Sequence, residues 1–314
     1  MDLQTTTILG IKITLNDKKD IINYVLDYLQ KKSGQPLVIF TPNPEQIIQA
    51  RENPEFSRVL NRGDINLPDG QRLVWADKLV GSAQLAVDRQ KPQTANRKPQ
   101  TLLRIAGIEF MEELVKAAAK KDYPIALIGG REESAAGALN KLKQKYPGLK
   151  GWAEKSPEFR IRNQESGIMD KKISPDSMFI IQDSSLQIKD YFNQLAKRII
   201  RSNTKLVFVG LGAPKQEIFI KAISQQLSAV RQSEDGKPST RTQAEGLKVE
   251  SSPIILMSVG GAFDILSGKL PRVPKVLSNL EFIWRLILEP GRFIRQLRLL
   301  KFIYLVYKQR FVLK

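Results

Sequence analysis

A short apolar segment, a turn rich in Gly, Pro or Asn, and then a stretch with helical spacing form a unit that recurs along most of this chain. The apolar segments cover residues 37–40, 125–128, 206–209 and 254–259, and residues 178–181 form a further candidate strand. Neighbouring parallel strands need a crossover connection, which is usually a helix. The repeated unit therefore predicts an α/β fold with a mostly parallel sheet and helices on both faces.

Three parts of the chain depart from this pattern. Residues 82–100 and 231–250 are polar, rich in Gln, Pro, Ser and Thr, and without periodicity, which predicts flexible surface loops or insertions. Residues 269–314 contain eleven basic residues and two acidic ones, so this segment carries +9 of the net charge of +18. We therefore expect an α/β domain over residues 1–268 and a separate C-terminal appendage over residues 269–314.

The chain contains neither cysteine nor histidine. This excludes a disulfide framework, a thiolate nucleophile, a Ser-His-Asp triad and metal sites built on thiolate or imidazole. An enzyme of this composition needs a carboxylate, a lysine, a tyrosine or its own substrate for proton transfer near neutral pH. We expect no metal and no cofactor. We also expect a cytoplasmic protein, because a secretion signal and a spanning apolar segment are both absent from the sequence.

Glycine-containing turns follow three of the predicted strands. Ligands of an open parallel sheet bind beyond the carboxyl ends of its strands, and the first turn of the next helix can bind phosphate. We therefore predict a nucleotide-phosphate site formed by Gly129, Gly130, Gly210, Gly212, Lys215, Gly260 and Gly261. Each turn alone is also compatible with a plain strand-to-helix connection. The third glycine of a dinucleotide-binding fingerprint is absent, which disfavours a nicotinamide-dependent oxidoreductase.

Polar side chains with catalytic potential follow two other apolar segments. Thr41 and Asn43 come directly after residues 37–40, and Asn43 also suits the N-cap of a helix. Asp69 belongs to an Asp-Gly pair that is typical of turns. It precedes an apolar helix face at Leu73–Trp75 rather than lying in a polar loop. Those surroundings favour a semi-buried general base.

Six segments of the sequence resemble those of the WecG/TagA/CpsF glycosyltransferases, in the same order: TPNPEQ, PDGQRLVWA, RIAGIEFMEELV, ALIGG, VFVGLGAPKQE and VGGAFDILSGKLPRVPK. The resemblance covers nearly the whole chain except the two polar stretches. It implies a Rossmann-like fold and an inverting, metal-independent transfer of an N-acetylhexosamine-type sugar, N-acetylmannosamine or its uronic acid, from a UDP donor. The implied acceptor is a polyprenyl-diphosphate-linked N-acetylglucosamine at the inner face of the plasma membrane, in the synthesis of a cell-surface polysaccharide.

The resemblance also implies roles for individual residues. Asp69 falls on the family's candidate base, and the other catalytic positions fall on Thr41, Asn43 and Gln216. Arginines that bind the acceptor diphosphate fall on Arg104, Arg272, Arg285 and Arg292. The sequence departs from the family pattern around the Asp-Gly pair, at Pro68 and at Gln71–Arg72, which leaves the exact sugar open.

The C-terminal appendage combines its basic residues with Phe, Trp and Tyr in one or two predicted amphipathic helices. This combination favours binding to an anionic membrane surface, and helices that pack on the core with solvated charges are the alternative. For the whole chain, the rival interpretation is a non-catalytic basic α/β protein that binds a membrane or nucleic acid. We expect no nucleic-acid partner, because no reader motif accompanies the charge. Homo-oligomerisation stays open.

Overall fold

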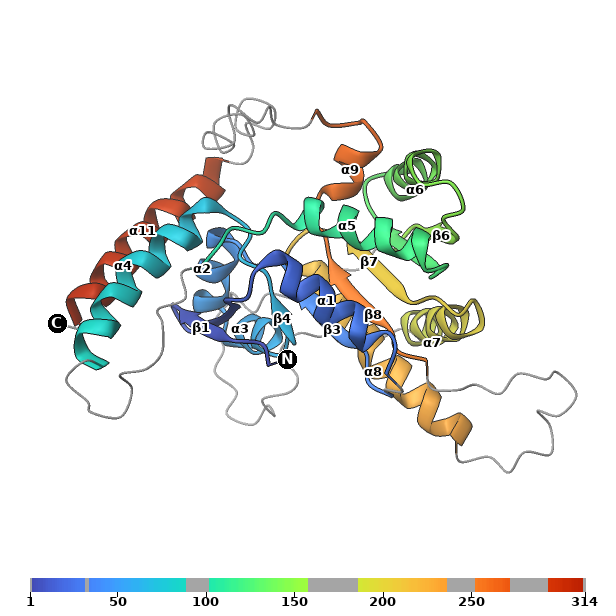
Figure 1. The fold of residues 1–314 in the computed structure, drawn as a ribbon, viewed down its shortest axis with the longest axis horizontal. Coiled ribbons are helices and arrows are strands. Elements are labelled where there is room, and N and C mark those ends of the chain that lie inside the picture. The colour runs from blue at the N-terminus through green and yellow to red at the C-terminus, as the bar shows by residue number, and fades with distance from the viewer. Residues whose placement is uncertain are drawn as a thin grey trace, which may run out of the picture. The chain divides into compact units, whose positions relative to one another are not determined.

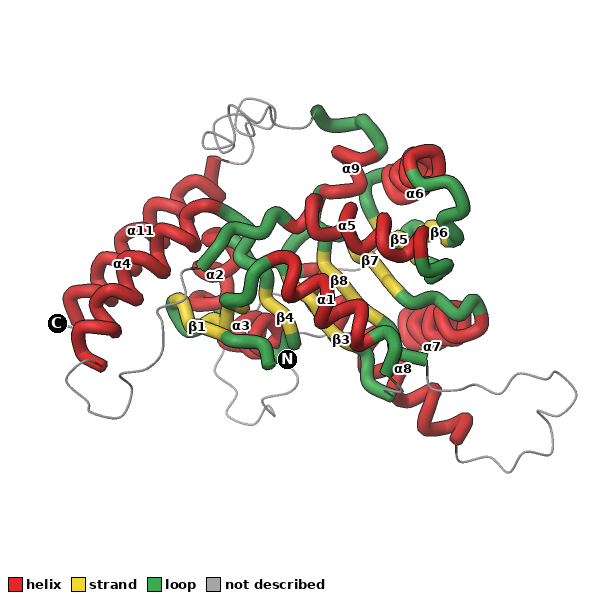
Figure 2. Tube along the Cα trace, in the orientation of Figure 1, coloured by secondary structure: helices red, strands yellow, loops and turns green. Residues whose placement is uncertain are grey.

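The computed structural model describes residues 2–31, 34–88, 102–157, 186–235, 252–271 and 293–312 (Figure 1). Its central sheet has the strand order β4-β3-β8-β7-β5-β6. These strands are β3 (Leu37–Phe40), β4 (Ile65–Asn66), β5 (Ile125–Gly129), β6 (Gly151–Glu154), β7 (Leu206–Gly210) and β8 (Ile255–Ser258). The recorded pairings of β3 with β4, of β5 with β6 and β7, and of β7 with β8 are all parallel. The predicted α/β fold with a parallel sheet is confirmed, and helices flank the strands (Figure 2). The candidate strand at residues 178–181 lies outside the described residues.

The chain clusters into two compact units. Unit 1 comprises residues 1–24, 39–112 and 270–314, and unit 2 comprises residues 25–38 and 113–269. The boundary passes through β3, whose first two residues belong to unit 2 and whose last two belong to unit 1. The segment predicted as a separate appendage clusters with residues 39–112 from Leu270 onward.

Unit 1 contains the hairpin of β1 (Thr5–Ile8) and β2 (Ile11–Thr14), followed by α2 (Pro44–Glu52), α3 (Pro54–Asn61), α4 (Gln71–Asp88) and α11 (Phe293–Val312). Unit 2 contains α6 (Ser134–Lys145), α7 (Leu186–Arg201), α8 (Lys215–Asp235) and α9 (Ala262–Leu266). The helices α1 (Lys18–Tyr28) and α5 (Gly107–Lys120) have residues in both units.

Two predicted loops are partly helical, so their predicted boundaries were wrong. Residues 82–88 continue α4, and residues 231–235 continue α8. Neither segment contains a proline or glycine, and α8 ends directly before the Gly236–Lys237–Pro238 sequence. Because polar residues such as Gln and Arg are good helix formers, the lack of an apolar period did not stop either helix. The rest of both stretches, residues 89–100 and 236–250, lies outside the described residues.

The core of unit 2 lies around β5, β7 and β8, whose residues are buried throughout. Strands covered on both faces are apolar along their whole length rather than alternating, which explains why these segments read as continuous apolar runs. Helix α8 contributes Phe219, whose ring centroid lies 5.0 Å from that of Phe192 on α7. The α8 and α7 layer therefore packs through aromatic side chains.

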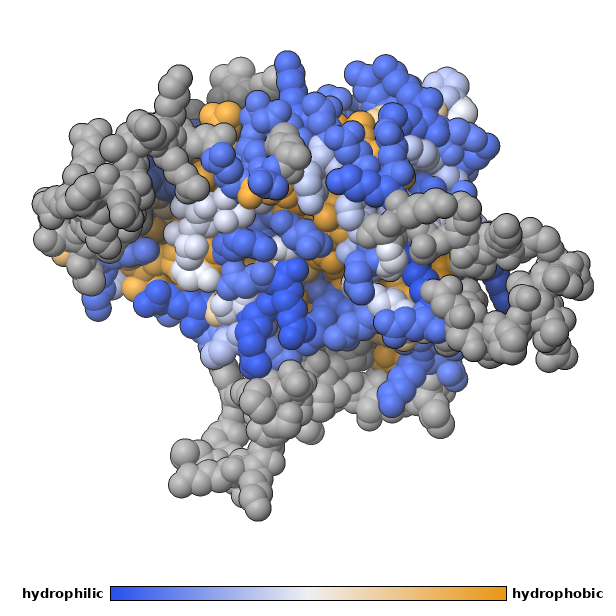
Figure 3. Space-filling model, turned by 60° about the horizontal axis from the view of Figure 1, so that its bottom comes forward, coloured by the Kyte–Doolittle hydropathy of each residue, from blue (hydrophilic) through white to orange (hydrophobic). Residues whose placement is uncertain are grey.

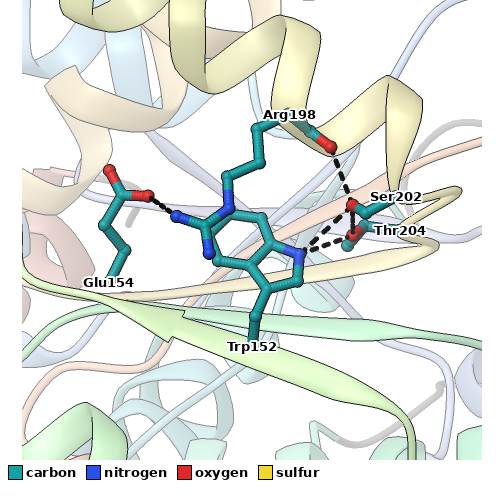
Figure 4. A network of polar contacts seen from close by, with 5 residues as sticks. All are labelled: Trp152, Glu154, Arg198, Ser202 and Thr204. Atoms are coloured by element: carbon teal, nitrogen blue, oxygen red, sulfur yellow. Dashed lines mark hydrogen bonds and ion pairs between the residues drawn. The ribbon is translucent and has the colours of Figure 1, made fainter.

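Side chains of the edge strand β6 form a polar network with residues of α7 and of the turn that follows it (Figure 4). The Arg198 guanidinium lies 4.0 Å from the centroid of the Trp152 ring and donates to Glu154 Oε2 at 2.6 Å. The Trp152 indole N–H donates to Thr204 Oγ1 at 3.0 Å and to Ser202 Oγ at 3.2 Å. A bulky, charged side chain over an edge strand discourages pairing with another chain, so the network is a structural feature of the sheet edge. Burial raises the pKa of the neighbouring Tyr191 hydroxyl.

In unit 1, α11 packs along α2 and α4, and the three helices lie side by side in Figures 1 and 2. Phe302 and Val306 of α11 are fully buried. The Tyr307 ring meets the Trp75 ring of α4 edge-on, with 5.5 Å between the centroids. Residues 293–312 of the predicted amphipathic appendage therefore form a helix with one face against α2 and α4 of the same unit. Residues 272–292 lie outside the described residues.

Candidate functional site

The residues that follow β3 and β4 lie together in unit 1. The Leu67 N–H donates to the Phe40 carbonyl at 2.8 Å, and the Asp69 N–H donates to the Pro42 carbonyl at 3.2 Å. These bonds continue the pairing of β3 with β4 beyond the strands. Because parallel strands end at the same edge of a sheet, Thr41 and Asp69 reach the same place from different parts of the sequence.

Two glycines show how closely this region is packed. A Cβ atom at Gly107, the first residue of α5, would lie 3.0 Å from Thr41 Cγ2 and 3.7 Å from Asp69 Oδ2. Gly70 has a φ of +127°, which glycine adopts readily, and its Cβ position is 3.5 Å from Pro44 Cδ. The Asp69 carboxylate therefore lies near the amino end of α5, where the helix dipole stabilises negative charge. Asp69 is half-exposed and Thr41 is buried, and a half-exposed carboxylate can accept a proton from a bound hydroxyl group.

Asn43 has a structural task at this site. Its Oδ1 accepts from the Gln46 N–H at 3.0 Å, and its own N–H donates to Gln46 Oε1 at 3.0 Å. This reciprocal pair is a capping box that starts α2, with Pro44 at the first helical position. The predicted N-cap is confirmed, whereas the predicted catalytic role of Asn43 stays a prediction.

Several charged side chains of unit 1 are partly buried. Arg104 is half-buried on the segment that precedes α5, where the Ile105 N–H donates to the Pro68 carbonyl at 3.0 Å. Burial lowers the pKa of Arg72 in the first turn of α4, and the charge of Glu45 opposes that shift. Burial also raises the pKa of Asp77, while a hydrogen bond from the Leu102 N–H to Asp77 Oδ2, 3.1 Å long, acts in the other direction. Unit 1 thus places several titratable groups in partly desolvated positions near the strand ends.

The glycine turns of unit 2 separate into two kinds. A Cβ atom at Gly129 would lie 2.5 Å from Leu211 Cδ2, and one at Gly210 would lie 2.7 Å from Phe263 Cδ2. The Gly130 N–H donates to the Gly210 carbonyl at 2.7 Å. In these places the missing side chain lets one turn pack against the next. The predicted role of Gly129, Gly130 and Gly210 in phosphate binding therefore has a competing explanation in packing.

The other three glycines face open space. Within the described part of the chain, and apart from the neighbouring residues in sequence, no atom lies within 4 Å of the Cβ position of Gly212, Gly260 or Gly261. Gly212 and Gly260 also have positive φ angles, of +71° and +55°. Lys215 is exposed at the start of α8, next to the first of these turns. Pro214 lies directly before α8, and its carbonyl accepts the Ile218 N–H at 3.2 Å. Backbone that an approaching ligand can reach, beside a helix start and a lysine, suits a phosphate group.

Gln216 and Glu217 lie behind these turns and are almost completely buried, with exposed fractions of 1% and 0%. Gln216 Oε1 accepts from the Gly260 N–H at 2.9 Å, and Gln216 Nε2 donates to Glu217 Oε1 at 2.7 Å. Asp264 on α9 is buried to 8% exposure, and its Oδ1 makes no hydrogen bond with the described part of the chain.

Sequence reasoning missed the roles of Gly107, Glu217 and Asp264. All three belong to quoted motifs, yet only their neighbours were singled out, because the motif alone does not say which side chain is buried. Three of the predicted acceptor residues, Arg272, Arg285 and Arg292, lie outside the described residues.

The parallel six-stranded sheet with flanking helices is a Rossmann-like fold, in which ligands bind beyond the carboxyl ends of the strands. The chain belongs to the glycosyl transferase WecG/TagA/CpsF family, whose sequence profile matches residues 6–232 and 242–314. It is therefore a glycosyltransferase, as its sequence motifs predict. The chain is 28% identical over 310 residues to the N-acetylglucosaminyldiphosphoundecaprenol N-acetyl-beta-D-mannosaminyltransferase of Bacillus subtilis strain 168, with 98% of this chain and 93% of that protein covered.

Proposed function

We propose that this glycosyltransferase moves an N-acetyl-β-D-mannosaminyl group from a UDP donor to a polyprenyl-diphosphate-linked N-acetylglucosamine. The name of the Bacillus subtilis relative supports this sugar and this acceptor. The observation that carries the proposal on the chain itself is the meeting of Asp69, Thr41 and Gly107 in unit 1. The proposed product belongs to the synthesis of a cell-surface polysaccharide.

The donor diphosphate binds, in this proposal, at the turns of unit 2 that face open space. Gly212, Gly260 and Gly261 let the backbone approach the phosphate oxygens, and Lys215 adds a positive charge. Because backbone N–H groups and cations can hold the charge that develops on the leaving UDP, the leaving group needs neither a proton nor a metal ion.

Asp69 acts as the general base. The acceptor hydroxyl oxygen forms a bond to the anomeric carbon while the bond from that carbon to the UDP oxygen breaks. The hydroxyl proton passes to the Asp69 carboxylate, and UDP leaves with its electron pair. Attack from the face opposite to UDP inverts the anomeric configuration. In this proposal Thr41, which is buried in the same region as Asp69, hydrogen-bonds the reacting groups, and Asn43 caps α2 next to it.

The acceptor and the membrane are bound by the C-terminal segment and by Arg104. Of the six large hydrophobic side chains exposed in the described part of the chain, five lie on α11: Leu297, Leu300, Tyr304, Tyr307 and Phe311. They recur at spacings of three or four residues and so form one stripe along the helix. On the face drawn in Figure 3, by contrast, hydrophilic residues cover most of the described surface.

An apolar and aromatic stripe on a basic helix is typical of a helix that lies in a membrane interface. Lys308 and Arg310 accompany the stripe, whereas Lys301 is held by Glu52 of α2 at 2.6 Å. No helix in the described ranges is long and apolar enough to cross a bilayer. We therefore propose peripheral association with the inner face of the plasma membrane, where Arg104, Arg272, Arg285 and Arg292 pair with the acceptor diphosphate.

The test is a donor screen with a short-chain lipid-diphosphate N-acetylglucosamine, read by mass spectrometry in the presence of a chelator. We expect transfer from UDP-N-acetylmannosamine and loss of more than about a hundredfold in the rate for Asp69→Asn, with an unchanged melting temperature. Transfer from UDP-N-acetylmannosaminuronic acid alone would correct the sugar. Full activity of Asp69→Asn would remove Asp69 from the mechanism.

A thermal-shift assay separates the rival functions. UDP should raise the melting temperature without added metal, and NAD should not, since only a ligand that binds the native state stabilises it. A response to NAD alone would favour an oxidoreductase. Binding to anionic liposomes without any sugar transfer from the donors tested would favour a non-catalytic membrane protein.

A further inference from the structure

Gln216 uses both ends of its side-chain amide inside the protein. The oxygen end accepts the Gly260 N–H at 2.9 Å, and the nitrogen end donates to Glu217 Oε1 at 2.7 Å. Both side chains are buried, with exposed fractions of 1% and 0%. Gln216 therefore links the start of α8 to the turn between β8 and α9, and Glu217 lies behind that link.

The order of these two bonds has a physical reason. Only the oxygen end of an amide can accept a backbone N–H, and the two ends have nearly the same shape. A carboxyl oxygen of Glu217 accepts from the nitrogen end, so the Gln216 oxygen must face Gly260. Without that acceptor, a flipped amide would direct an N–H group at the Gly260 N–H, and both donors would lose their partner.

The turn held by this link is the open one. Gly260 has a φ of +55°, and no atom of a residue that the structure describes, chain neighbours aside, lies within 4 Å of the Cβ positions of Gly260 and Gly261. With no side chains to support it, the turn depends on hydrogen bonds for its shape. The backbone supplies two of them, from the Val259 N–H to the Val209 carbonyl at 2.9 Å and from the Ala262 N–H to the Val259 carbonyl at 3.1 Å. The Gln216 side chain supplies the one at Gly260 itself.

We propose that Glu217 is a positioning residue that acts through Gln216 to fix the Gly260–Gly261 turn for donor binding. Gln216 is then also a positioning residue, in contrast to the catalytic role that the family resemblance implies. The inference rests on the proposed function insofar as this turn binds the donor diphosphate. Because the Gly260 N–H is already bonded to Gln216, we expect the turn to present its backbone to the donor at Gly261.

Four variants test this arrangement. Gln216→Ala removes the acceptor, and we expect UDP to bind about three- to tenfold more weakly, as for the loss of one hydrogen bond. Glu217→Gln replaces the carboxylate acceptor behind Gln216 by a neutral amide, which can turn either its oxygen or its nitrogen toward Gln216, and so should weaken UDP binding by a smaller factor. Gln216→Glu alone places two buried carboxyl groups side by side and should be harmful. The exchanged pair Gln216→Glu/Glu217→Gln keeps an oxygen facing Gly260 and an amide donor behind it, so UDP affinity should return to within about twofold of wild type.

Gln226→Ala is the matched control. Gln226 lies on the same helix, and its amide bonds to Asn193 Oδ1 on α7 at 3.5 Å, away from the glycine turns. This variant should leave UDP affinity and transfer unchanged. Melting temperatures of all variants show whether each one folds.

Two measurements decide the outcome. A positioning role changes the dissociation constant of UDP and the KM of the donor in parallel, while kcat changes little. Amide hydrogen exchange at Gly260, followed by NMR, should quicken in Gln216→Ala and Glu217→Gln and slow again in the exchanged pair. A loss of kcat with unchanged UDP affinity and unchanged Gly260 exchange would overturn the proposal, because Gln216 would then act on the substrate. An exchanged pair no better than the single variants would overturn it as well.

The exchange measurement also separates this proposal from the proposed function. It reports the hydrogen bond at Gly260 whether or not UDP is the donor. If wild-type protein transfers no sugar from any UDP donor but Gly260 exchange follows the variant series, the proposed function fails while the link from Glu217 to the turn stands.

Discussion

Gly210 and Gly261 provide a direct test of which glycines serve packing and which serve the ligand. Gly210 is the last residue of β7 and Gly261 follows β8, both in unit 2. The test replaces each of them by alanine. A Cβ atom at Gly210 would lie 2.7 Å and 2.8 Å from two ring carbons of Phe263 and 3.0 Å from the Gly260 carbonyl oxygen. At the Cβ position of Gly261 no atom of the described, non-adjacent residues lies within 4 Å, and the Gly261 φ of −84° is one that alanine adopts easily.

The expected stability changes have opposite signs. Overpacking of a buried position costs about 1–3 kcal/mol, and the Gly210→Ala contact includes backbone that cannot move aside, so we expect the upper half of that range. Gly261→Ala meets no contact and reduces the entropy of the unfolded chain, which should stabilise by up to about 1 kcal/mol. Urea denaturation of the two variants and wild type measures both changes.

UDP binding should respond in the opposite way. A methyl group at Gly261 occupies the space through which the donor diphosphate approaches, so Gly261→Ala should bind UDP at least about tenfold more weakly despite its stability. Gly210→Ala should keep most of its affinity where it is folded. The reasoning is refuted if Gly210→Ala is as stable as wild type, or if Gly261→Ala binds UDP with wild-type affinity in calorimetry.

Two further predictions concern unit 1. Phe302→Ala should destabilise the protein by about 3–5 kcal/mol, because a fully buried ring is lost. Tyr304→Ser changes a side chain that is 64% exposed, so it should leave the free energy of unfolding unchanged but reduce binding to anionic liposomes. Liposome binding equal to that of wild type would remove Tyr304 from the membrane face. Asp77→Asn should raise stability at neutral pH, since burial raises the pKa of Asp77 and so disfavours its ionised form in the folded state. That gain should shrink as the pH falls below the raised pKa and vanish below the ordinary pKa of an aspartate, where the carboxyl group is protonated in both the folded and the unfolded state. A gain independent of pH in urea denaturation would contradict this cause.

Much of the sheet could be predicted because its signal is local. The segments at 37–40, 125–128, 206–209 and 254–259 correspond to β3, β5, β7 and β8, whose burial on both faces makes them continuously apolar. The short strands β4 and β6 were missed. β4 has only two residues, and β6 is half-buried at the sheet edge, so neither carries a long apolar run.

The position of Asp69 illustrates how far motif reasoning reaches. Its Asp-Gly pair and the apolar helix that follows were visible in the sequence, and they pointed to a semi-buried carboxylate. The partners that make it a candidate base were not, because Thr41 and Gly107 lie 28 residues before it and 38 residues after it. Only the pairing of β3 with β4 and the start of α5 bring them together.

The sequence by itself determined the fold class, the strands that end in polar or glycine turns, and the absence of thiol and imidazole chemistry, since each follows from composition or short-range periodicity. The tertiary structure decided which of the six candidate glycines in those turns face open space. Gly210 and Gly260 look alike in the sequence. A Cβ atom added at Gly210 would meet the Phe263 ring, whereas one added at Gly260 would meet no atom of the described, non-adjacent residues. That difference depends on which distant side chain packs against each turn, and packing between remote segments is not written in any local pattern.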